Sequence, residues 1–303
     1  MSVSPSSHPL HGWLVIDKPL RMGSTGAVSA VKRALREGGY PKLKVGHGGT
    51  LDPLASGVLP VAIGEATKLC GRMLGADKVY EFTIRFGEET DTLDSEGQVV
   101  ARSERRPTRA EAEAVLPQFT GAIEQVPPAF SALKVEGKRA YALARSGTPP
   151  EMKSRRVTIH SLALLSSSSP GEVTLVASVS KGTYIRSLAR DIARALGTVG
   201  HVVMLRRLKA GPFTFEQAIP LDKLAGLATA RRLEQALLPL TAGLDDIPAL
   251  PVAPDQARAL REGRKAIGTA AQHGLHLATD ESVPVALVEA EGGELRVVRG
   301  FNL

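Results

Sequence analysis

The segment that most narrows the possible structures of this chain is a glycine-rich loop that holds a single carboxylate. Residues 46–59 read GHGGTLDPLASGVL, so Asp52 lies between glycines and a proline, with apolar stretches on either side. Gly48 and Gly49 allow the backbone to turn or to approach a ligand closely, and Pro53 restricts the main chain next to the acid. We therefore expect Asp52 to be held with little freedom. An aspartate that caps the following turn is the alternative, because Asp-Pro pairs in loops often do so.

The composition indicates a globular protein of a reducing compartment. The chain has 303 residues, of which 43% are hydrophobic, and this is enough for one large domain and a small one. The only cysteine, Cys70, excludes an internal disulfide and a cysteine-based metal cluster. No apolar run reaches the ~20 residues that span a bilayer, and the first ten residues lack the pattern of a signal peptide. We expect a cytoplasmic protein in which residues 1–9 are disordered.

Positive charge is concentrated in one part of the chain. Residues 125–215 contain 14 Lys and Arg against 4 Asp and Glu, whereas residues 76–124 contain 6 against 11. This asymmetry indicates a surface that follows a phosphate backbone, because neutralising phosphates releases counterions and gives affinity without sequence preference. A basic face that only keeps the protein in solution is the alternative. The candidate phosphate contacts are Lys134, Lys138, Arg139, Arg155, Arg156, Arg206 and Arg207.

The hydrophobic pattern predicts mixed strands and helices without a regular βαβ alternation. Strands are expected at residues 12–19, 78–86 and 172–180, and helices at residues 27–37 and 184–196. In the strand at residues 78–86, side chains alternate between two faces, and Tyr80 lies on the same face as the apolar Phe82, Ile84 and Phe86. Tyr80 is therefore expected to point toward the apolar side of its strand.

One arginine stands out in the helix predicted at residues 184–196. Ile185, Leu188, Ile192 and Leu196 form its apolar stripe, and Arg186 lies in the first turn, off that stripe. A cation at the start of a helix opposes the helix dipole. Arg186 is therefore expected to have a carboxylate or phosphate partner. An exposed arginine without a partner is the alternative.

The last sixty residues predict a small β-rich module. A helix-like segment at residues 233–240, LEQALLPL, is followed by the turn residues Gly243 and Asp245, which indicate a boundary. After it, residues 259–263 are expected to be helical, and residues 283–290 and 294–303 are expected to form strands.

Four blocks together resemble the TruB family of tRNA pseudouridine synthases. The first is the loop at residues 46–59 with GEATKL at residues 64–69. The others are QVPPAFSALKVEGKRAYALARSG at residues 125–147, KGTYIRSLARDI at residues 181–192 and HVVMLRRLKAGPF at residues 201–213. Their order and spacing resemble the family pattern over residues 12–215. One departure is visible, since many members carry a hydroxyl residue where Gly48 stands, and it bears on the shape of that loop.

The resemblance implies an α+β fold. It implies a pseudouridine-synthase-like mixed, mostly antiparallel sheet flanked by helices and loops, with a small β-rich C-terminal PUA-like domain. The catalytic domain is expected at residues 10–243 and the PUA-like RNA-binding domain at residues 247–303. VVRGFNL, at residues 297–303, resembles the last strand of that domain.

The resemblance also implies roles for five side chains. Asp52 corresponds to the catalytic aspartate, Tyr80 to the tyrosine that stacks on the target base, and Arg186 to the arginine that pairs with the carboxylate. Leu205 corresponds to the apolar residue of the pocket and His47 to the histidine beside the flipped nucleotide. The implied reaction converts uridine to pseudouridine at position 55, in the T loop of tRNA. A carboxylate can support this by covalent attack or by proton removal, and a guanidinium can bind it through two nitrogen atoms.

We expect no metal and no cofactor. GHGGTLD lacks the Lys-Ser or Lys-Thr of a nucleotide phosphate loop. DTLDSEG, at residues 91–97, lacks the alternating ligands and closing glutamate of a calcium loop, and the seven histidines form no zinc pattern.

Two alternatives to a stand-alone tRNA enzyme stay open. A guide-RNA-dependent synthase of the related dyskerin type would have an extended C-terminal domain and protein partners. A non-catalytic tRNA-binding or tRNA-folding protein would use the same basic surface. We expect the T arm of tRNA as partner, with no membrane and no obligate protein partner, and a monomeric protein.

Overall fold

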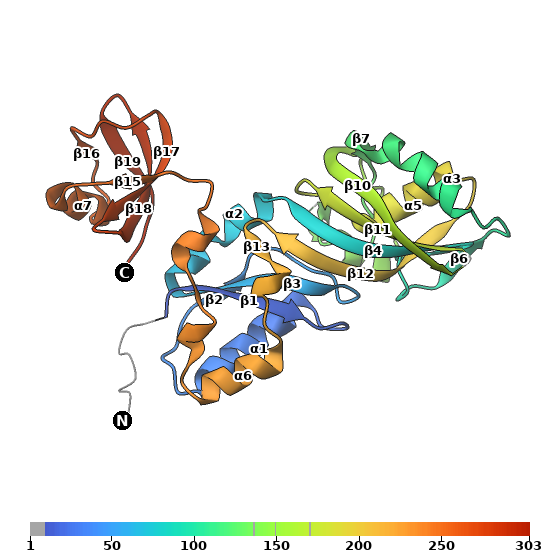
Figure 1. Ribbon diagram of the computed structural model, residues 1–303, viewed down its shortest axis with the longest axis horizontal. Helices are drawn as coiled ribbons and strands as arrows, with labels where there is room; N and C mark the ends of the chain where they lie inside the picture. Colours follow the sequence, from blue (N-terminus) through green and yellow to red (C-terminus); the bar gives the residue numbers. More distant parts are fainter. Residues whose placement is uncertain (1–9, 136, 149, 170) are drawn as a thin grey trace.

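A mixed sheet of ten strands dominates the described part of the chain (Figure 1). The computed structural model describes residues 10–135, 137–148, 150–169 and 171–303, so the expectation for residues 1–9 lies outside it. In order across the sheet, eight strands are β14 (Leu238–Pro239), β1 (Gly12–Lys18), β3 (Ser56–Ile63), β12 (Gly200–Ala210), β4 (Lys78–Phe86), β11 (Glu172–Val179), β10 (Arg155–Ser169) and β7 (Gly121–Gln125). Two further strands lie off this path. β2 (Val45–His47) pairs with β3, and β13 (Phe213–Thr214) pairs with β12. All pairs are antiparallel except β12 with β3, which confirms the expected mostly antiparallel sheet.

The half of the sheet around β1 is covered on both faces. Leu14 and Ile16 of β1 face one hydrophobic cluster, and Trp13 and Val15 face another. This explains why β1 is a continuous apolar run rather than an alternating one. The helices α1 (Ser24–Glu37) and α6 (Leu221–Thr229) lie side by side against the first face (Figure 1). The predicted strand at residues 12–19 and helix at residues 27–37 are confirmed.

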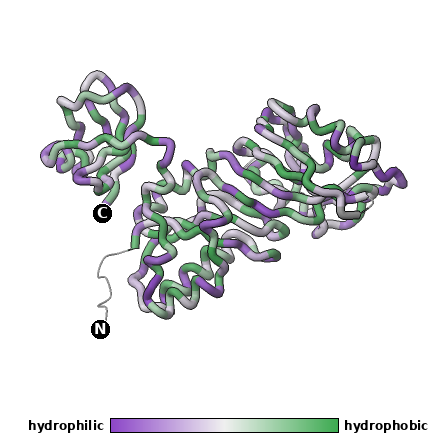
Figure 2. The backbone as a smooth tube through the Cα atoms, viewed as in Figure 1, coloured by the Kyte–Doolittle hydropathy of each residue, from purple (hydrophilic) through white to green (hydrophobic). Residues whose placement is uncertain are grey.

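The other half of the sheet carries the remaining predicted elements. The strands β4 and β11 confirm the expected strands at residues 78–86 and 172–180. The apolar stripe of α5 (Ile185–Ala195) is buried, as are Phe82, Ile84 and Phe86 of β4. In Figure 2, hydrophobic and hydrophilic residues are mixed along the strands of this half. The smaller elements of this half are β5 (Glu88–Thr90), β6 (Val99–Arg102), α3 (Arg109–Val115), η2 (Leu116–Phe119), β8 (Lys134–Val135), β9 (Lys138–Arg139) and α4 (Ala140–Arg145).

The C-terminal segment forms a β domain with its own sheet. That sheet consists of β15 (Ala249–Pro251), β17 (Gly274–Asp280), β18 (Val283–Glu291), β19 (Glu294–Gly300) and β16 (Ala266–Ile267), with α7 (Pro254–Arg261) packed on it. The expected strands at residues 283–290 and 294–303 are confirmed as β18 and β19. The helix expected at residues 259–263 begins earlier, at Pro254, and ends at Arg261. No helix in the described residues is long and apolar enough to cross a membrane.

The helix expected at residues 233–240 is wrong. The segment instead forms two short 3-10 helices, η4 (Leu233–Gln235) and η5 (Leu240–Gly243), with strand β14 between them. Pro239 cannot donate a helical hydrogen bond, and the edge of β1 offers β14 a partner. Residues 238–239 therefore pair with the edge of the sheet, although their apolar spacing is typical of a helix.

The GEATKL segment docks the C-terminal β domain. It forms the 3-10 helix η1 (Gly64–Leu69), which leads into α2 (Cys70–Gly75). Lys68 Nζ donates to the carbonyl of Gly300 at 2.9 Å, and the amide of Asn302 donates to Glu65 Oε2 at 2.8 Å. Between these contacts Phe301 is buried in one cluster with Trp13. The two domains thus share a hydrophobic core at the end of the chain.

This shared core predicts a large effect of truncating Phe301. Phe301→Ala should lower the free energy of unfolding by about 3–5 kcal/mol, because it leaves a cavity between the domains. Urea denaturation followed by tryptophan fluorescence measures this, since Trp13 is the only tryptophan. Leu303→Ala, at a side chain that is 48% exposed, is the matched control and should change little. Equal unfolding midpoints for both variants would contradict the assignment.

Candidate active site

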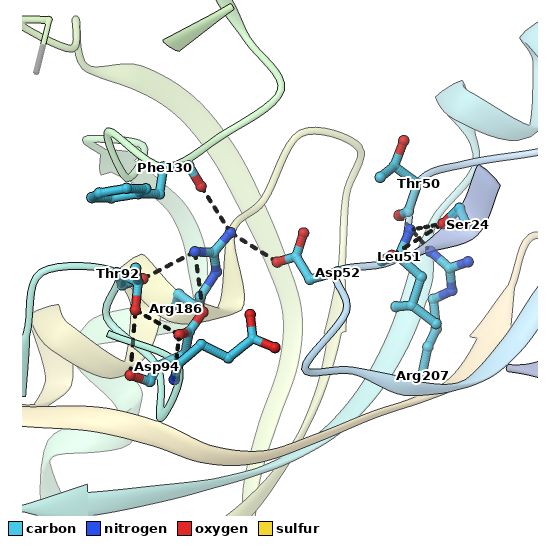
Figure 3. A network of polar contacts seen from close by, with 10 residues as sticks. Ser24, Thr50, Leu51, Asp52, Thr92, Asp94, Phe130, Arg186 and Arg207 are labelled. Atoms are coloured by element: carbon cyan, nitrogen blue, oxygen red, sulfur yellow. Dashed lines mark hydrogen bonds and ion pairs between the residues drawn. The ribbon is translucent and has the colours of Figure 1, made fainter. Parts of the chain in front are cut away.

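The loop that carries Asp52 connects β2 to β3 and is fixed by its main chain. Ser24 Oγ, at the start of α1, accepts from the amide of Leu51 at 2.8 Å and donates to its carbonyl at 3.0 Å (Figure 3). The amide of Ala55 donates to the carbonyl of Asp52 at 3.0 Å and closes a turn. Gly49 has a φ of 134°, which an L side chain rarely adopts. The restriction of Asp52 expected from the sequence is thus present.

The departure at Gly48 has a steric explanation. A Cβ atom built there would lie 2.7 Å from Cβ of Met73 on α2. A hydroxyl residue at this position would therefore displace Met73, which is buried. The pairing of glycine with methionine keeps the loop against α2.

Arg186 joins Asp52 to a second carboxylate. Its Nη2 lies 2.8 Å from Asp52 Oδ2, and its Nη1 lies 3.3 Å from Asp94 Oδ2. The guanidinium also donates to the carbonyls of Thr92 at 2.9 Å and Phe130 at 3.1 Å (Figure 3). The expected partner carboxylate is confirmed, with Nη2 reaching Asp52 and Nη1 reaching Asp94. The planar group is shared between two acids.

Asp94 is the member of this network that sequence reasoning missed. It is 3% exposed, and its Oδ1 accepts from Thr92 Oγ1 at 2.6 Å and from the amide of Glu96 at 3.0 Å. It lies in DTLDSEG, a segment that was interpreted only by its difference from a calcium-binding loop. The density of acids there is the signal that could have suggested a partner for Arg186. Burial, with Asp94 and Asp52 nearby, also raises the pKa of Glu96.

A buried glutamine holds the start of α5, where Arg186 lies. Gln125 is 1% exposed, its amide nitrogen donates to the carbonyl of Tyr184 at 3.2 Å, and its oxygen accepts from the Tyr184 amide at 2.8 Å. This pairing satisfies main-chain groups at the helix start. Arg186 is only 6% exposed in its side chain, so the carboxylates offset the burial of a cation at this end.

A cavity of about 500 Å³ opens onto this network. Asp52, Arg186, Tyr80 and Leu205 all line it, and the Asp52 side chain is 36% exposed toward it. The volume falls within the ~300–1,000 Å³ typical of small-ligand sites. The structure therefore brings four of the five predicted residues to one cavity. In the described residues, no group of three or more His, Cys, Asp or Glu side chains could hold a metal ion.

His47 is the predicted residue that does not line the cavity. It is half-buried, and its Nδ1 accepts from the amide of Gly49 at 3.4 Å. Burial, with the nearby cation of Arg207, lowers the pKa of His47. Its contact is with Gly49, which does line the cavity, so His47 lies next to the loop that carries Asp52.

Two buried lysines lie near the cavity with lowered pKa values. Burial lowers the pKa of Lys18 to about 8, and the charge of Asp52 opposes this shift. Burial, with Arg207 nearby, also lowers the pKa of Lys78 to about 8. Lys78 lines the cavity and donates to the carbonyls of Met73 and Leu74 at 3.0 Å, at the end of α2. Besides Arg186, Lys18 is thus a second cationic group close to Asp52.

The candidate phosphate contacts differ in exposure. Lys134, Lys138, Arg139 and Arg156 are exposed. Arg155 is half-buried, with its guanidinium 4.9 Å from the ring centre of Tyr184, and Arg206 contacts Asp17 at 3.4 Å. Arg207 is 1% exposed and binds main-chain carbonyls, so its assignment as a phosphate contact is wrong. A surface charge count cannot tell an inward arginine from an outward one.

Known families match most of the chain. Residues 33–185 match the N-terminal domain of the TruB family of pseudouridylate synthases, and residues 186–245 match the C-terminal domain of tRNA pseudouridylate synthase B. The chain is 61% identical over 303 residues to tRNA pseudouridine synthase B of Zymomonas mobilis, covering 100% of both chains. It is 64% identical over 296 residues to the protein of that name from Novosphingobium aromaticivorans, covering 96% of this chain and 97% of the relative.

Solved structures support the fold. A chain of a Cbf5-Nop10-Gar1 complex is 25% identical, with a TM-score of 0.73 and coverage of 96% of this chain and 85% of that one. A chain of an H/ACA ribonucleoprotein bound to a substrate RNA containing 2′-deoxyuridine has the same TM-score at 24% identity, with coverage of 96% and 85%. The cavity, the sequence relatives and the fold agree, and this chain belongs to the TruB family of pseudouridylate synthases.

Proposed function

We propose that the chain converts uridine to pseudouridine at position 55, in the T loop of tRNA, with Asp52 as the catalytic residue. One observation carries this proposal: Asp52 is held 2.8 Å from Arg186 and still faces a cavity lined by Tyr80 and Leu205. The tRNA pseudouridine synthases that are up to 64% identical support the same reaction. The protein is then an isomerase, an intramolecular transferase that needs no redox partner.

The chemistry assigns a task to each side chain. The reaction breaks the bond between C1′ of the ribose and N1 of the uracil and forms one from C1′ to C5, after which C5 loses a proton and N1 gains one. The Asp52 carboxylate can attack covalently or remove a proton, and both routes need it charged and fixed. Arg186 positions it, Tyr80 offers a ring face to the detached uracil, and Leu205 excludes water. His47 would lie beside the flipped nucleotide, next to Gly49.

The target base lies inside a folded loop of RNA, so it has to leave its stack. Flipping costs a few kcal/mol, which contacts with the surrounding RNA backbone have to offset. We assign these contacts to the exposed basic residues of residues 125–215 and to the C-terminal β domain. In this proposal residues 10–243 are the catalytic domain, and residues 247–303 are a PUA-type RNA-binding domain. The protein would act in the cytoplasm as a monomer without a protein partner.

A T-arm stem-loop RNA tests the proposal against its alternatives. Purified protein, with no guide RNA and no second protein, should form one pseudouridine in this RNA at position 55. The same RNA with cytidine at that position should give none. Product only after addition of a guide RNA would support a guide-dependent synthase, and binding without product would support a non-catalytic RNA-binding protein.

The basic surface predicts separate effects on affinity and on turnover. Replacing Lys138 and Arg139 together by glutamine should weaken tRNA binding and flatten its salt dependence, by about one unit in the log-log slope for each phosphate that is no longer neutralised. Turnover at saturating tRNA should barely change. Lys32 and Arg33, exposed on α1, form the control pair, and their replacement by glutamine should leave the slope unchanged. Equal slopes for both pairs would show that residues 138 and 139 do not contact RNA.

A further inference from the structure

Arg207 is a buried arginine whose guanidinium binds main chain on both sides of Asp52. Its Nε donates to the carbonyl of Val58 at 2.7 Å, its Nη1 to Thr50 at 3.1 Å and its Nη2 to Gly49 at 3.4 Å. Gly49 and Thr50 precede Asp52, and Val58 follows it in β3. A single side chain thus contacts the main chain before and after Asp52, and Figure 3 shows its guanidinium beside Thr50.

The partners of Arg207 explain why an arginine stands there. It is 1% exposed, and no carboxylate of the described residues forms an ion pair with it. Burying an unpaired cation is costly, so the three carbonyls have to replace its hydration. Only a guanidinium presents several donors in a rigid planar fork that reaches separate carbonyls at once. A neutral apolar side chain would fill the space without holding the loop.

The strand that carries Arg207, β12, has a short contact with β3, which we call the seam. β12 pairs with β3 in parallel only at Arg206 with Ser56 and at Arg207 with Gly57. A Cβ atom on Gly57 would lie 2.3 Å from the carbonyl oxygen of Arg207, so glycine allows the two strands to approach. On its other side, Arg207 is in register with Tyr80 of β4. Through β12, the seam therefore joins β3, which follows the Asp52 loop, to β4, which carries Tyr80.

We propose that Arg207 is a positioning residue, which holds the Asp52 loop at the seam so that the carboxylate stays within reach of Arg186 and of the nucleotide in the cavity. This inference rests on the proposed function of Asp52. Arg207 acts through the main chain of the loop. It also lines the cavity, as does Leu205, two residues earlier on the same face of β12.

Two substitutions test this role. Arg207→Lys keeps the charge but replaces the fork by one nitrogen atom, which cannot reach both flanks of the loop, and Arg207→Met removes charge and donors together. Each should lower the single-turnover rate of pseudouridine formation at saturating tRNA by ~100-fold, the loss typical of misplacing a reacting group by about 1 Å. The Kd for tRNA should stay within about threefold of wild type. Hydrogen exchange should rise at the amides of residues 48–56, while β4 and β11 stay protected.

The control is Leu116→Ala, a core truncation in η2, which packs against α3, α5 and β10. It should lower thermal stability without changing the rate or the exchange of residues 48–56. A weaker Kd with a smaller salt slope and an unchanged rate in Arg207→Met, which removes the charge, would overturn the proposal in favour of a phosphate contact. Exchange that rises across the whole sheet would overturn it in favour of a general stabilising role. If wild-type protein forms no pseudouridine, the proposed function fails, and the local exchange pattern still decides whether Arg207 holds the loop.

Discussion

Asp52→Asn is expected to abolish pseudouridine formation while leaving the affinity for tRNA close to that of wild type. The amide keeps the shape of the side chain but cannot attack carbon or accept a proton as a carboxylate does. We expect the single-turnover rate to fall by at least ~1,000-fold, in the range typical of removing a catalytic group. The Kd should be unchanged or lower, because the substitution removes a negative charge near the RNA backbone.

The control for this variant is Asp245→Asn, at an exposed carboxylate in the connection to the C-terminal β domain. It removes the same charge from the surface and should change neither rate nor affinity. Residual turnover of Asp52→Asn within about tenfold of wild type would contradict the catalytic assignment. A parallel loss of tRNA binding would mean that Asp52 serves the fold or the RNA contact instead of the chemistry.

Arg186→Lys is expected to lower the rate by ~100-fold or more although the positive charge is kept. In the structure the guanidinium reaches Asp52, Asp94 and two carbonyls at once, and an ammonium group cannot present that geometry. The Asp52 carboxylate would lose its fixed orientation, and Asp94 would be left buried without a full partner. Rate at saturating tRNA and Kd, measured separately, should show the loss in the rate.

Arg190→Lys, one turn later in α5, is the matched control. Arg190 contacts Asp191 at 2.8 Å and donates to the carbonyl of Val126 at 3.1 Å, and it does not line the cavity. Its substitution changes the same functional group on the same helix and should have little effect on the rate. If Arg186→Lys is as active as Arg190→Lys, the pairing with Asp52 has no catalytic importance.

Local patterns in the sequence predict much of this fold. The strand at residues 78–86 and the helix at residues 184–196 each bury one face, so their periodicity alone reveals them. The same reasoning fails at residues 233–240, where β14 depends on the edge of β1, more than 220 residues away in the chain. An apolar spacing does not report which sheet edge is available.

The residues of the site also fall into some that the local sequence indicates and one that depends on the tertiary fold. The loop composition and the helix position point to Asp52 and Arg186, because an acid in a rigid loop and a cation at a helix start both need a partner. For Asp94 the density of acids in its segment is the only sequence signal, because its contact with Arg186 joins segments 92 residues apart that only the tertiary fold brings together. Arg207 was within reach of the sequence. Alternation in the strand gives it the same face as the apolar Leu205, and this marks it as an inward side chain.

Mapping pseudouridine at single-nucleotide resolution in an unmodified tRNA transcript tests the central claim most directly. The transcript is incubated with the purified chain alone, and Asp52→Asn is run beside it. Our account predicts pseudouridine at position 55 and at no other uridine with wild-type protein, and none with the variant. Equal product from both proteins, or no product from wild type on a correctly folded transcript, would contradict it.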